Sequence, residues 1–596
     1  MDRIRLEKNL SSLRESLCAG QAQNDRGNPV AATNAFHSPG IASGVSPYFV
    51  RRLPRHDAFH FFILSISFAL LSLSIAQAQV NRYMVFFVDK AGTPHSISSP
   101  ETFLSARALQ RRSNQNISIS EQDLPVTPGY VEDVRNAGVT VLYNTKWMNG
   151  VLVECTDADV STLEALSFVS SVEYVAPDGR PASGGRKKSS RKFKDSSGNA
   201  AVTDVQLAIL GLDAMHEAGY RGEGMLIAIM DAGFQGADTI SFFRHVFDEN
   251  RFDAATSYDF VSGGSNVFQQ NNHGTNVWST IAAFKVNEFI GGAFNANFIL
   301  FVTEHDPTEY RVEEYHWLFA AERADSAGVD VINTSLGYNT FDDSQMNYST
   351  AQLDGQTTVI TRAAEIAVGK GIAVVVSAGN EGSASPTTIT APADGENVLA
   401  VGAVTAEGVK TSFSSIGPSA DGRIKPDVVA LGSLVSVIKP DGTLSSSSGT
   451  SLAAPLATSL VTGVWQRLPE LSAKEILDTI RGRASQSNNP DNQLGYGIPN
   501  FNYVITSADA VIPADFVSVF PNPALNQVKI EFLDNVQSDQ LNITLVDAKG
   551  TVSNVGSSQI SNREFLIDLS DKEHGLYLLL LQRGRQISTH KILKIE

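Results

Sequence analysis

Short apolar runs alternate with longer amphipathic stretches through the middle of the chain. The amphipathic stretches at 312–327 and 357–367 have helical spacing. The apolar runs are residues 225–230, 298–302, 331–333, 372–376 and 398–401. A strand that is apolar at every position is buried on both faces, as in a parallel sheet. Strands that alternate with helices favour an α/β fold in which helices cover both faces of that sheet. The pattern predicts such a domain over residues 196–510.

Residues 79–195 show a different, α+β pattern that ends in a basic linker. Apolar strands are expected at 83–88, 150–154 and 171–175, and helices at 101–112 and 162–166. The stretch from 180 to 194 then carries seven Lys or Arg residues among Ser and Gly. A nucleic-acid patch is one interpretation, but few aromatic residues interleave the charges, which favours a solvated, protease-accessible linker. We predict cleavage of the chain between Gly179 and Ala201.

From residue 517 the apolar residues recur at every second position. Five strands are predicted, at 517–520, 528–532, 541–546, 565–569 and 576–581. Turns separate them, among them Ala548-Lys549-Gly550 and His574-Gly575. Short strands at this spacing predict a β-sandwich over residues 513–596.

The start of the chain contains a predicted secretory signal. Residues 59–76 are apolar, arginines precede them at 51, 52 and 55, and Ala76-Gln77-Ala78 follows. This arrangement predicts a signal peptide over 51–78 with cleavage after Ala78. Residues 1–50 are polar and aperiodic, so we interpret them as an extension from a start codon assigned too early. A signal-anchor is the alternative, although the run is short for a membrane span.

Composition narrows the class of protein and its partners. The 596 residues are 42% hydrophobic and 18% charged, which is typical of globular proteins, and the formal charge is −17. An acidic balance argues against nucleic acid as a partner. The two cysteines, Cys18 and Cys155, lie outside the predicted α/β domain, so that domain has no disulfide and no cysteine-based zinc site.

Three polar residues stand where α/β folds place catalytic groups. Asp231 ends the apolar run 225–230, His273 opens a helical stretch, and Ser451 lies within Gly-Thr-Ser-Leu-Ala-Ala-Pro at 449–455. Thr450 is expected to cap the helix that Ser451 begins, whose free N–H groups suit a developing oxyanion. Each residue alone also has an ordinary explanation, as a loop cap, a helix-start histidine or a capped helix. Their occurrence together favours a nucleophilic site.

These three motifs, in the order Asp, His, Ser, resemble those of the subtilisin-like serine peptidases, the subtilases. The resemblance implies that Ser451 is the nucleophile, His273 the general base and Asp231 the group that orients the histidine. It also implies that Asn380, in Ser-Ala-Gly-Asn-Glu-Gly, is the oxyanion donor. Two substrate-binding stretches are implied as well: Ser335, Leu336 and Gly337 as an edge for an extended peptide, and Ser377, Ala378 and Gly379 as the opposite wall of the primary pocket. Thr390 aligns loosely with the floor of that pocket.

The chain departs from the usual subtilase pattern at three positions. Leu452 follows the nucleophile where many subtilases have methionine, and Asn276 and Trp278 replace a histidine and an alanine after the catalytic histidine. No metal ligand set is predicted and the chemistry requires no cofactor. Structural calcium is common in the family, and Asp342, Asp343 and Asp354 are candidate ligands, although their spacing matches no known ligand loop.

The flanking regions also resemble parts of secreted subtilases. The α+β region 79–195 resembles an inhibitory propeptide, and Pro-Asn-Pro at 521–523 with Gly-Leu-Tyr at 575–577 resembles the sorting domain of type IX secretion. A carbohydrate-binding sandwich is the alternative for the latter. The implied partners are protein or peptide substrates, the chain's own propeptide and the outer-membrane secretion machinery. The implied location is secreted or at the cell surface.

Two functions from different classes fit these features. The first is a secreted serine endopeptidase, either a processing enzyme with one substrate or a nutritional protease of broad range. The second is a surface-displayed binding protein on an inactive subtilase scaffold. Inactive relatives usually lose a catalytic residue or the oxyanion donor, whereas Asp231, His273, Asn380 and Ser451 are all present. The sequence therefore favours the endopeptidase.

Overall fold

The computed structural model describes residues 79–177, 203–384, 388–508, 517–532, 541–547, 552–555, 557–583 and 586–595. The predicted N-terminal extension, the signal peptide and the basic linker lie outside these residues. Within the described part of the chain, no helix is long and apolar enough to cross a membrane.

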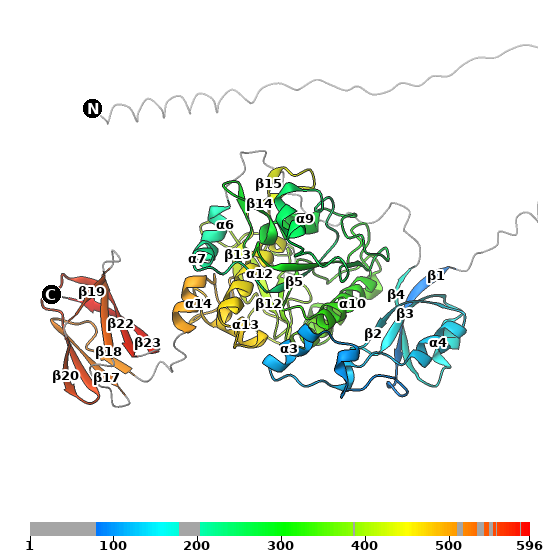
Figure 1. The fold of residues 1–596 in the computed structure, drawn as a ribbon, viewed down its shortest axis with the longest axis horizontal. Coiled ribbons are helices and arrows are strands. Elements are labelled where there is room, and N and C mark those ends of the chain that lie inside the picture. The colour runs from blue at the N-terminus through cyan, green and yellow to red at the C-terminus, as the bar shows by residue number, and fades with distance from the viewer. Residues whose placement is uncertain are drawn as a thin grey trace, which may run out of the picture. The chain divides into compact units, whose positions relative to one another are not determined.

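A seven-stranded parallel sheet forms the core of the α/β domain (Figure 1). Its strand order is β13-β12-β11-β10-β5-β9-β6. The strands are β5 (Leu226–Asp231), β6 (Tyr258–Asp259), β9 (Asn297–Val302), β10 (Val331–Thr334), β11 (Ala373–Ser377), β12 (Leu399–Val404) and β13 (Val428–Leu431). The predicted α/β sheet is therefore confirmed, and β6 and β13 are strands that the sequence pattern did not reveal.

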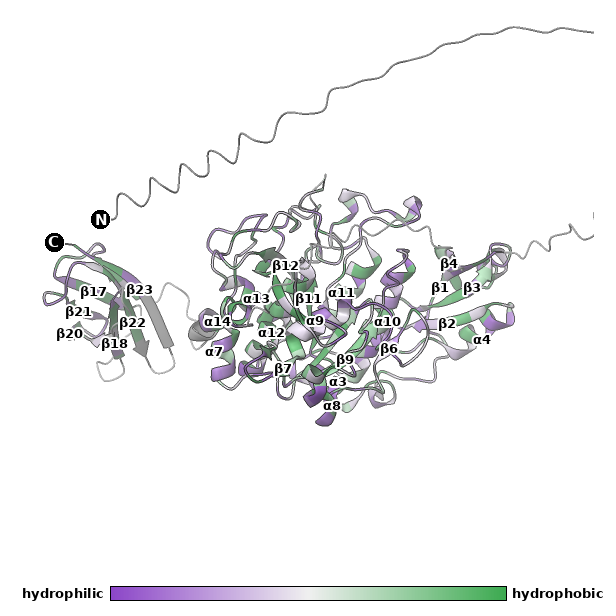
Figure 2. Cartoon of the chain, turned by 90° about the horizontal axis from the view of Figure 1, so that it is seen from above, coloured by the Kyte–Doolittle hydropathy of each residue, from purple (hydrophilic) through white to green (hydrophobic). Residues whose placement is uncertain are grey.

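Helices cover both faces of this sheet, as the apolar runs predicted. On one face lie α9 (His273–Ala282), α12 (Thr450–Arg467) and α13 (Ala473–Gly482), and on the other α10 (Val312–Ala327) and α11 (Val359–Gly369). Successive residues of β5 enter opposite cores: Ile227 and Ile229 pack with the first group and Ala228 with the second. Most residues of the central strands are correspondingly hydrophobic (Figure 2), and polar residues such as Asp231 and Asn333 stand at or near the strand ends. Shorter elements complete the region: α6 (Asp204–Ala208), α7 (Leu212–Glu217), α8 (Arg244–Asp248), α14 (Phe501–Ala508), β7 (Phe284–Lys285), β8 (Phe289–Ile290), β14 (Val435–Ile438) and β15 (Leu444–Ser447).

The N-terminal α+β region has a four-stranded sheet of order β2-β3-β1-β4. Its elements are β1 (Val80–Phe87), α3 (Ala106–Asn114), α4 (Pro128–Asn136), β2 (Thr140–Thr145), β3 (Gly150–Thr156), α5 (Val160–Glu164) and β4 (Val169–Pro177). The prediction of one helix over 101–112 was wrong, because Ser105 accepts a hydrogen bond from the Ala108 N–H and starts α3 at Ala106. α4 and β2 were not predicted.

The C-terminal region is a β-sandwich, as predicted. Its two sheets have the orders β16-β17-β21-β20 and β19-β18-β22-β23. Apolar residues of both, such as Ile530 and Leu579, share one core. The strands are β16 (Val517–Phe520), β17 (Gln527–Phe532), β18 (Leu541–Asp547), β19 (Val552–Asn554), β20 (Ser557–Ser561), β21 (Glu564–Asp568), β22 (Gly575–Arg583) and β23 (Gln586–Lys594).

One buried carboxyl in α10 links the stability of the fold to pH. Glu314 accepts hydrogen bonds from the Tyr348 hydroxyl (2.7 Å) and the Ile360 N–H (3.1 Å), and burial raises its pKa to about 7. The pKa of Glu314 is thus higher in the folded chain than its value of about 4.5 in the unfolded chain. The contribution of Glu314 to the free energy of unfolding is therefore fully present below about pH 4.5 and is lost as the pH rises through 7.

We expect Glu314→Gln to remove this loss, because the amide does not ionise and its oxygen can still accept from the Ile360 N–H while its NH2 group donates to the Tyr348 hydroxyl oxygen. The variant should gain up to about 3 kcal/mol in unfolding free energy relative to the parent between pH 4 and pH 8. Denaturant unfolding at both pH values, in a Ser451→Ala background that prevents self-digestion, measures the difference. An equal pH dependence in the two proteins would contradict the assignment.

Candidate active site

Asp231 and His273 meet at the carboxyl end of the central sheet. Asp231 is the last residue of β5 and is 1% exposed. Its Oδ1 accepts hydrogen bonds from the Ala232 N–H and from His273 Nδ1, both at 2.8 Å. His273 is the first residue of α9, where its own N–H donates to Asn271 Oδ1. A carboxylate on Nδ1 favours the tautomer in which Nε2 is the proton acceptor.

Ser451 lies in the first turn of α12, in a backbone arrangement that depends on small neighbours. A Cβ at Gly449 would lie 2.9 Å from the Ser451 Oγ, so a larger residue there would crowd the hydroxyl. Pro455 supplies no N–H to the Ser451 carbonyl, and the Ser335 hydroxyl donates to that carbonyl instead at 2.8 Å. This bond ties the start of α12 to the loop after β10.

The expectation that Thr450 caps α12 was wrong. The capping position is Gly449, and the Thr450 backbone N–H and hydroxyl both donate to Asn380 Oδ1 at 3.0 Å. Because the amide oxygen of Asn380 is fixed in this way, its NH2 group is directed away from Thr450. Asn380 is exposed, in the loop that follows β11, so the NH2 group is accessible from solvent.

We expect Asn380→Leu to lower kcat by about a hundred- to a thousand-fold, the range typical of the loss of one oxyanion-hole donor. KM should change little, because the amide acts on charge that develops in the transition state. Thr450→Val, which removes one of the two bonds that orient the amide, should cause a smaller loss. Steady-state kinetics on a peptide substrate measures both, and an Asn380→Leu enzyme with unchanged kcat would contradict the assignment.

The two predicted substrate-binding stretches, 335–337 and 377–379, lie close to each other, and both contact Thr390. The Ser377 hydroxyl donates to the Leu336 carbonyl at 3.3 Å, which joins the two stretches directly. A Cβ at Gly337 would lie 2.1 Å from Thr390 Oγ1, and one at Gly379 would lie 2.9 Å from it. The Thr390 side chain is buried beneath both glycines. Ala378 is fully buried between Ser377 and Gly379, at the carboxyl end of the sheet.

Asn333 is a residue of this site that the sequence did not single out. Its Nδ2 donates to the Ser335 hydroxyl (3.0 Å) and its Oδ1 accepts from the Thr458 hydroxyl (2.8 Å). It thereby connects β10 with α12 and supports the bond from Ser335 to Ser451. The one feature of the sequence that could have indicated this role is the position of Asn333, a polar residue near the end of a strand that begins with apolar residues.

Trp278 changes the packing behind His273. It is fully buried, with its ring stacked on Phe243 at 4.3 Å between centroids.

Leu452, which directly follows Ser451, is 2% exposed. Since methionine at that position would oxidise to a polar sulfoxide, we expect dilute peroxide to leave most of the activity intact, as measured by residual hydrolysis against time. Rapid inactivation would contradict this.

Each of the three candidate calcium ligands accepts a backbone hydrogen bond, Asp343 and Asp354 within a local turn and Asp342 from a loop 33 residues away. Asp342 accepts from the Glu309 N–H, Asp343 from the Gln345 N–H, and Asp354 from the Gln356 and Thr357 N–H groups. Among the described residues, no three His, Cys, Asp or Glu side chains come together as a metal site. A need for structural calcium stays a prediction.

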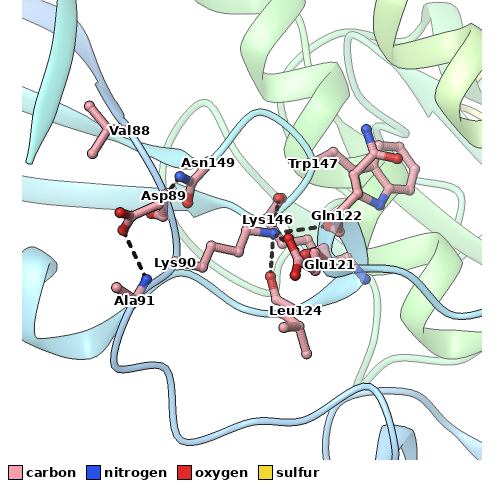
Figure 3. Close-up of a pocket in the computed structure, with 10 residues that line it drawn as sticks. All are labelled: Val88, Asp89, Lys90, Ala91, Glu121, Gln122, Leu124, Lys146, Trp147 and Asn149. Atoms are coloured by element: carbon pink, nitrogen blue, oxygen red, sulfur yellow. Dashed lines mark hydrogen bonds between the residues drawn. The ribbon is translucent and has the colours of Figure 1, made fainter.

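A cavity of about 600 Å³ is lined by residues of the N-terminal α+β region, among them Lys90, Lys146 and Trp147 (Figure 3). The Lys90 ammonium lies in its wall, within 3.1 Å of the carbonyl oxygens of Glu121, Gln122, Leu124 and Lys146. Burial lowers the pKa of Lys90 to about 8. Because a side chain of the same region satisfies these carbonyls, we interpret the contacts as a structural clamp.

The N-terminal region packs against α10 through buried charges. Asp325 of α10 accepts hydrogen bonds from Arg111 (2.6 Å), Arg112 (2.8 Å) and Lys146 (3.1 Å), and both of its oxygens are used. Burial opposes ionisation of Asp325, but the three cations hold its pKa below the usual value. One turn earlier, Glu322 accepts from the backbone N–H groups of Lys146 and Trp147. Arginines at the end of a short helix gave no signal of this role in the sequence.

Comparison with known proteins finds matches to three regions of the chain. The model of the subtilase family matches residues 222–497. A subtilisin from Bacillus pumilus is 30% identical over 275 residues, which cover 46% of this chain and 88% of the relative. The chain belongs to the subtilase family. Subtilisin NAT of Bacillus subtilis subsp. natto is 29% identical over 279 residues, 46% of this chain and 64% of the relative, so the chain spans just under two thirds of that relative's length.

Matches also cover the flanking regions of this subtilase. Residues 82–192 match the peptidase S8 propeptide domain of Bacteroidota, and residues 518–595 match the secretion system C-terminal sorting domain. Among solved structures, the MycP3 protease from the type VII (ESX-3) secretion system is similar, with 20% identity and a TM-score of 0.43, over 53% of this chain and 91% of that one. The predicted boundaries of the five segments stay predictions.

Proposed function

We propose that the chain is a secreted serine endopeptidase that hydrolyses peptide bonds through an acyl-enzyme on Ser451. Membership of the subtilase family and the subtilisin relatives support a serine endopeptidase. The observation that carries the residue assignment is the 2.8 Å hydrogen bond from His273 Nδ1 to the buried carboxylate of Asp231. It leaves Nε2 as the base of the imidazole, as a serine nucleophile requires.

In the proposed mechanism, the Ser451 hydroxyl attacks the carbonyl carbon of the substrate while His273 Nε2 takes its proton. Asp231 keeps the histidine in the required tautomer and stabilises the imidazolium without taking the proton. The Asn380 amide and the Ser451 backbone N–H donate to the oxyanion of the tetrahedral intermediate. The imidazolium then protonates the leaving amine, and water, activated by the same histidine, hydrolyses the acyl-enzyme.

The substrate is proposed to bind as an extended strand. Its backbone would pair with Ser335, Leu336 and Gly337, and the side chain preceding the scissile bond would enter between that edge and Ser377–Gly379. Backbone pairing gives affinity with modest sequence selectivity. Calcium is proposed as a structural ion at most, since the steps above need no metal.

The N-terminal region is proposed to act as an inhibitor until it is removed. The propeptide match and the buried contacts of Asp325 support this role. The C-terminal match indicates secretion by the type IX route. Export across both membranes, through the outer-membrane machinery and followed by release or surface attachment, is the fuller proposal.

Production of residues 79–596 tests the proposal against the inactive binding scaffold. An endopeptidase should shed its N-terminal region without an added protease, and N-terminal sequencing should find the new end between Gly179 and Ala201. It should then hydrolyse a denatured protein substrate. A folded chain that stays at precursor size and hydrolyses nothing would favour the binding protein.

A further inference from the structure

The segment around Thr390 is joined by its backbone to both sides of the predicted primary pocket. That pocket lies between the two substrate-binding stretches, which we call its walls. Ala391 exchanges backbone hydrogen bonds of 2.9 and 3.0 Å with Tyr338, the residue that directly follows the first wall. The Thr390 N–H donates to the carbonyl of Ala378, in the second wall, at 3.2 Å. Residue 390 is therefore held between the two walls.

The side chain of Thr390 is in contact with a glycine of each wall. A Cβ added at Gly337 would lie 2.1 Å from Thr390 Oγ1, and one added at Gly379 would lie 2.9 Å from the same atom. The Cβ at Gly379 would also lie 3.0 Å from Thr390 Cγ2. Both glycines therefore face one threonine side chain, which closes the space between the walls at this depth.

The two walls are also bonded to each other, which opposes widening of the pocket. The Ser377 hydroxyl donates to the Leu336 carbonyl at 3.3 Å, and both residues are buried, as Thr390 is. A large substrate side chain between the walls would have to displace Thr390 and separate these partners. Insertion of extra volume into a closely packed region is destabilising. Above Thr390 the pocket is more accessible, because Gly337 is half-buried and Asn380, which follows the second wall, is exposed.

Thr390 acts here through its volume and not through its hydroxyl. In the part of the chain that the structure describes, the hydroxyl has no hydrogen-bond partner, and its oxygen is shielded from solvent. Valine has nearly the same shape as threonine, and the two usually differ in a buried site because the hydroxyl is hydrogen-bonded. Since that difference does not apply at residue 390, valine there should close the pocket as threonine does.

We propose that Thr390 makes the primary pocket shallow, so that the enzyme cleaves after Gly, Ala or Ser and excludes aromatic and long aliphatic side chains at that position. The inference rests on the proposed endopeptidase and names its substrate class: proteins and peptides with a small residue directly before the scissile bond. Thr390 is then the residue that determines this preference, because its side chain lies between the two glycines.

The composition of the predicted maturation site agrees with this preference. Of the 23 residues from 179 to 201, 12 are Gly, Ala or Ser, and Phe193 is the only large apolar residue. In a chain that matures without an added protease, N-terminal sequencing should therefore find Gly, Ala or Ser directly before the new end. A new end directly after Phe193, or after one of the basic residues of this segment, would contradict the shallow pocket.

Matched peptides test the pocket directly. Alanine, leucine or phenylalanine is placed directly before the scissile bond of one peptide sequence, and mass spectrometry of the products verifies the bond that is cut. The value of kcat/KM is measured for the mature enzyme obtained from the full-length chain. The alanine peptide should exceed the phenylalanine peptide by about a hundredfold, within the range that one pocket gives for a difference in side-chain size.

Three variants of Thr390 separate volume from polarity. Thr390→Gly should lower the alanine-to-phenylalanine ratio by about tenfold or more, because it removes every atom that contacts the two glycines. Thr390→Ala keeps the Cβ and should lower the ratio by a smaller factor, which also tests the pocket if the glycine variant does not fold. Thr390→Val is the shape-matched control and should keep the ratio. The ratio is taken within each variant, so a general change in activity cancels.

Similar values of kcat/KM for the alanine and phenylalanine peptides in the wild-type enzyme would overturn the shallow pocket and leave the endopeptidase intact. A ratio that is unchanged in the glycine and alanine variants would overturn the role of Thr390. An equal loss of the ratio in the valine variant would overturn the assignment to volume. Absence of cleavage of all three peptides and of a denatured protein would instead contradict the proposed function itself.

Discussion

Ser451→Ala is expected to lower kcat on a peptide substrate by about a million-fold, the magnitude known for the nucleophile of subtilisin. The alanine cannot form the acyl-enzyme, whereas the fold should persist because the Ser335 bond goes to the backbone carbonyl of residue 451. The precursor should also keep its N-terminal region. Hydrolysis assays and the size of the purified chain measure the two effects.

A serine close in sequence provides the control for this variant. Ser446 lies in β15, five residues before Ser451, and pairs with Ser436 through the backbone. Ser446→Ala should therefore retain both hydrolysis and maturation. Comparable activity in the Ser451→Ala and wild-type proteins would contradict the mechanism.

Asp325→Ala is expected to weaken inhibition by the propeptide by roughly two to three orders of magnitude. The change leaves Arg111, Arg112 and Lys146 buried without their shared carboxylate, and loss of one partner of a buried ion pair costs about 3–5 kcal/mol. All three cations belong to the propeptide, so the mature enzyme loses none of these contacts. The inhibition constant of the propeptide, added to mature wild-type and variant enzymes, measures the effect.

Asp248→Ala is the matched control for the buried pair. Asp248 pairs with Arg244 on the surface of α8, at 3.3 Å, and both side chains are mostly exposed. Exposed pairs contribute about 0–1 kcal/mol, so this variant should leave the inhibition constant nearly unchanged. If Asp325→Ala had no larger effect than this control, the propeptide would be held by other contacts.

The central sheet and its helices could be predicted because their buried positions are occupied by apolar residues, which leave a regular pattern in the sequence. A strand such as β11 is apolar throughout, and α10 begins and ends where its spacing predicts, at 312 and 327. Short edge strands escaped prediction: β6 has two residues, and its place is set by pairing with β9 rather than by its own pattern.

The position of the candidate site could also be predicted from the sequence. The hydrogen bonds that hold its residues in place could not. Asp231 and His273 stand next to strong local signals, a strand end and a helix start, and the structure brings them within hydrogen-bond distance. The bonds from Thr450 to Asn380 and from Ser335 to Ser451 join residues 70 and 116 positions apart. Such contacts depend on tertiary packing, which no local spacing reveals.

The buried ion pairs between the propeptide and α10 escaped prediction for a related reason. Arg111 and Arg112 end an amphipathic helix, where basic residues are common because they face the helix dipole. Their burial arises when α3 docks on α10 and encloses Asp325, a residue more than 200 positions away. The position of a charged residue at a helix end does not show whether its side chain lies in solvent or is buried against an acidic partner.

Covalent labelling of the mature wild-type enzyme by a fluorophosphonate tests the central claim most directly. Digestion and mass spectrometry then locate the adduct. The mechanism predicts one adduct per chain, on Ser451, formed slowly or not at all when His273 is replaced by alanine. A folded enzyme that hydrolyses peptides without labelling, or with the adduct on another residue, would contradict the assignment of Ser451 as nucleophile.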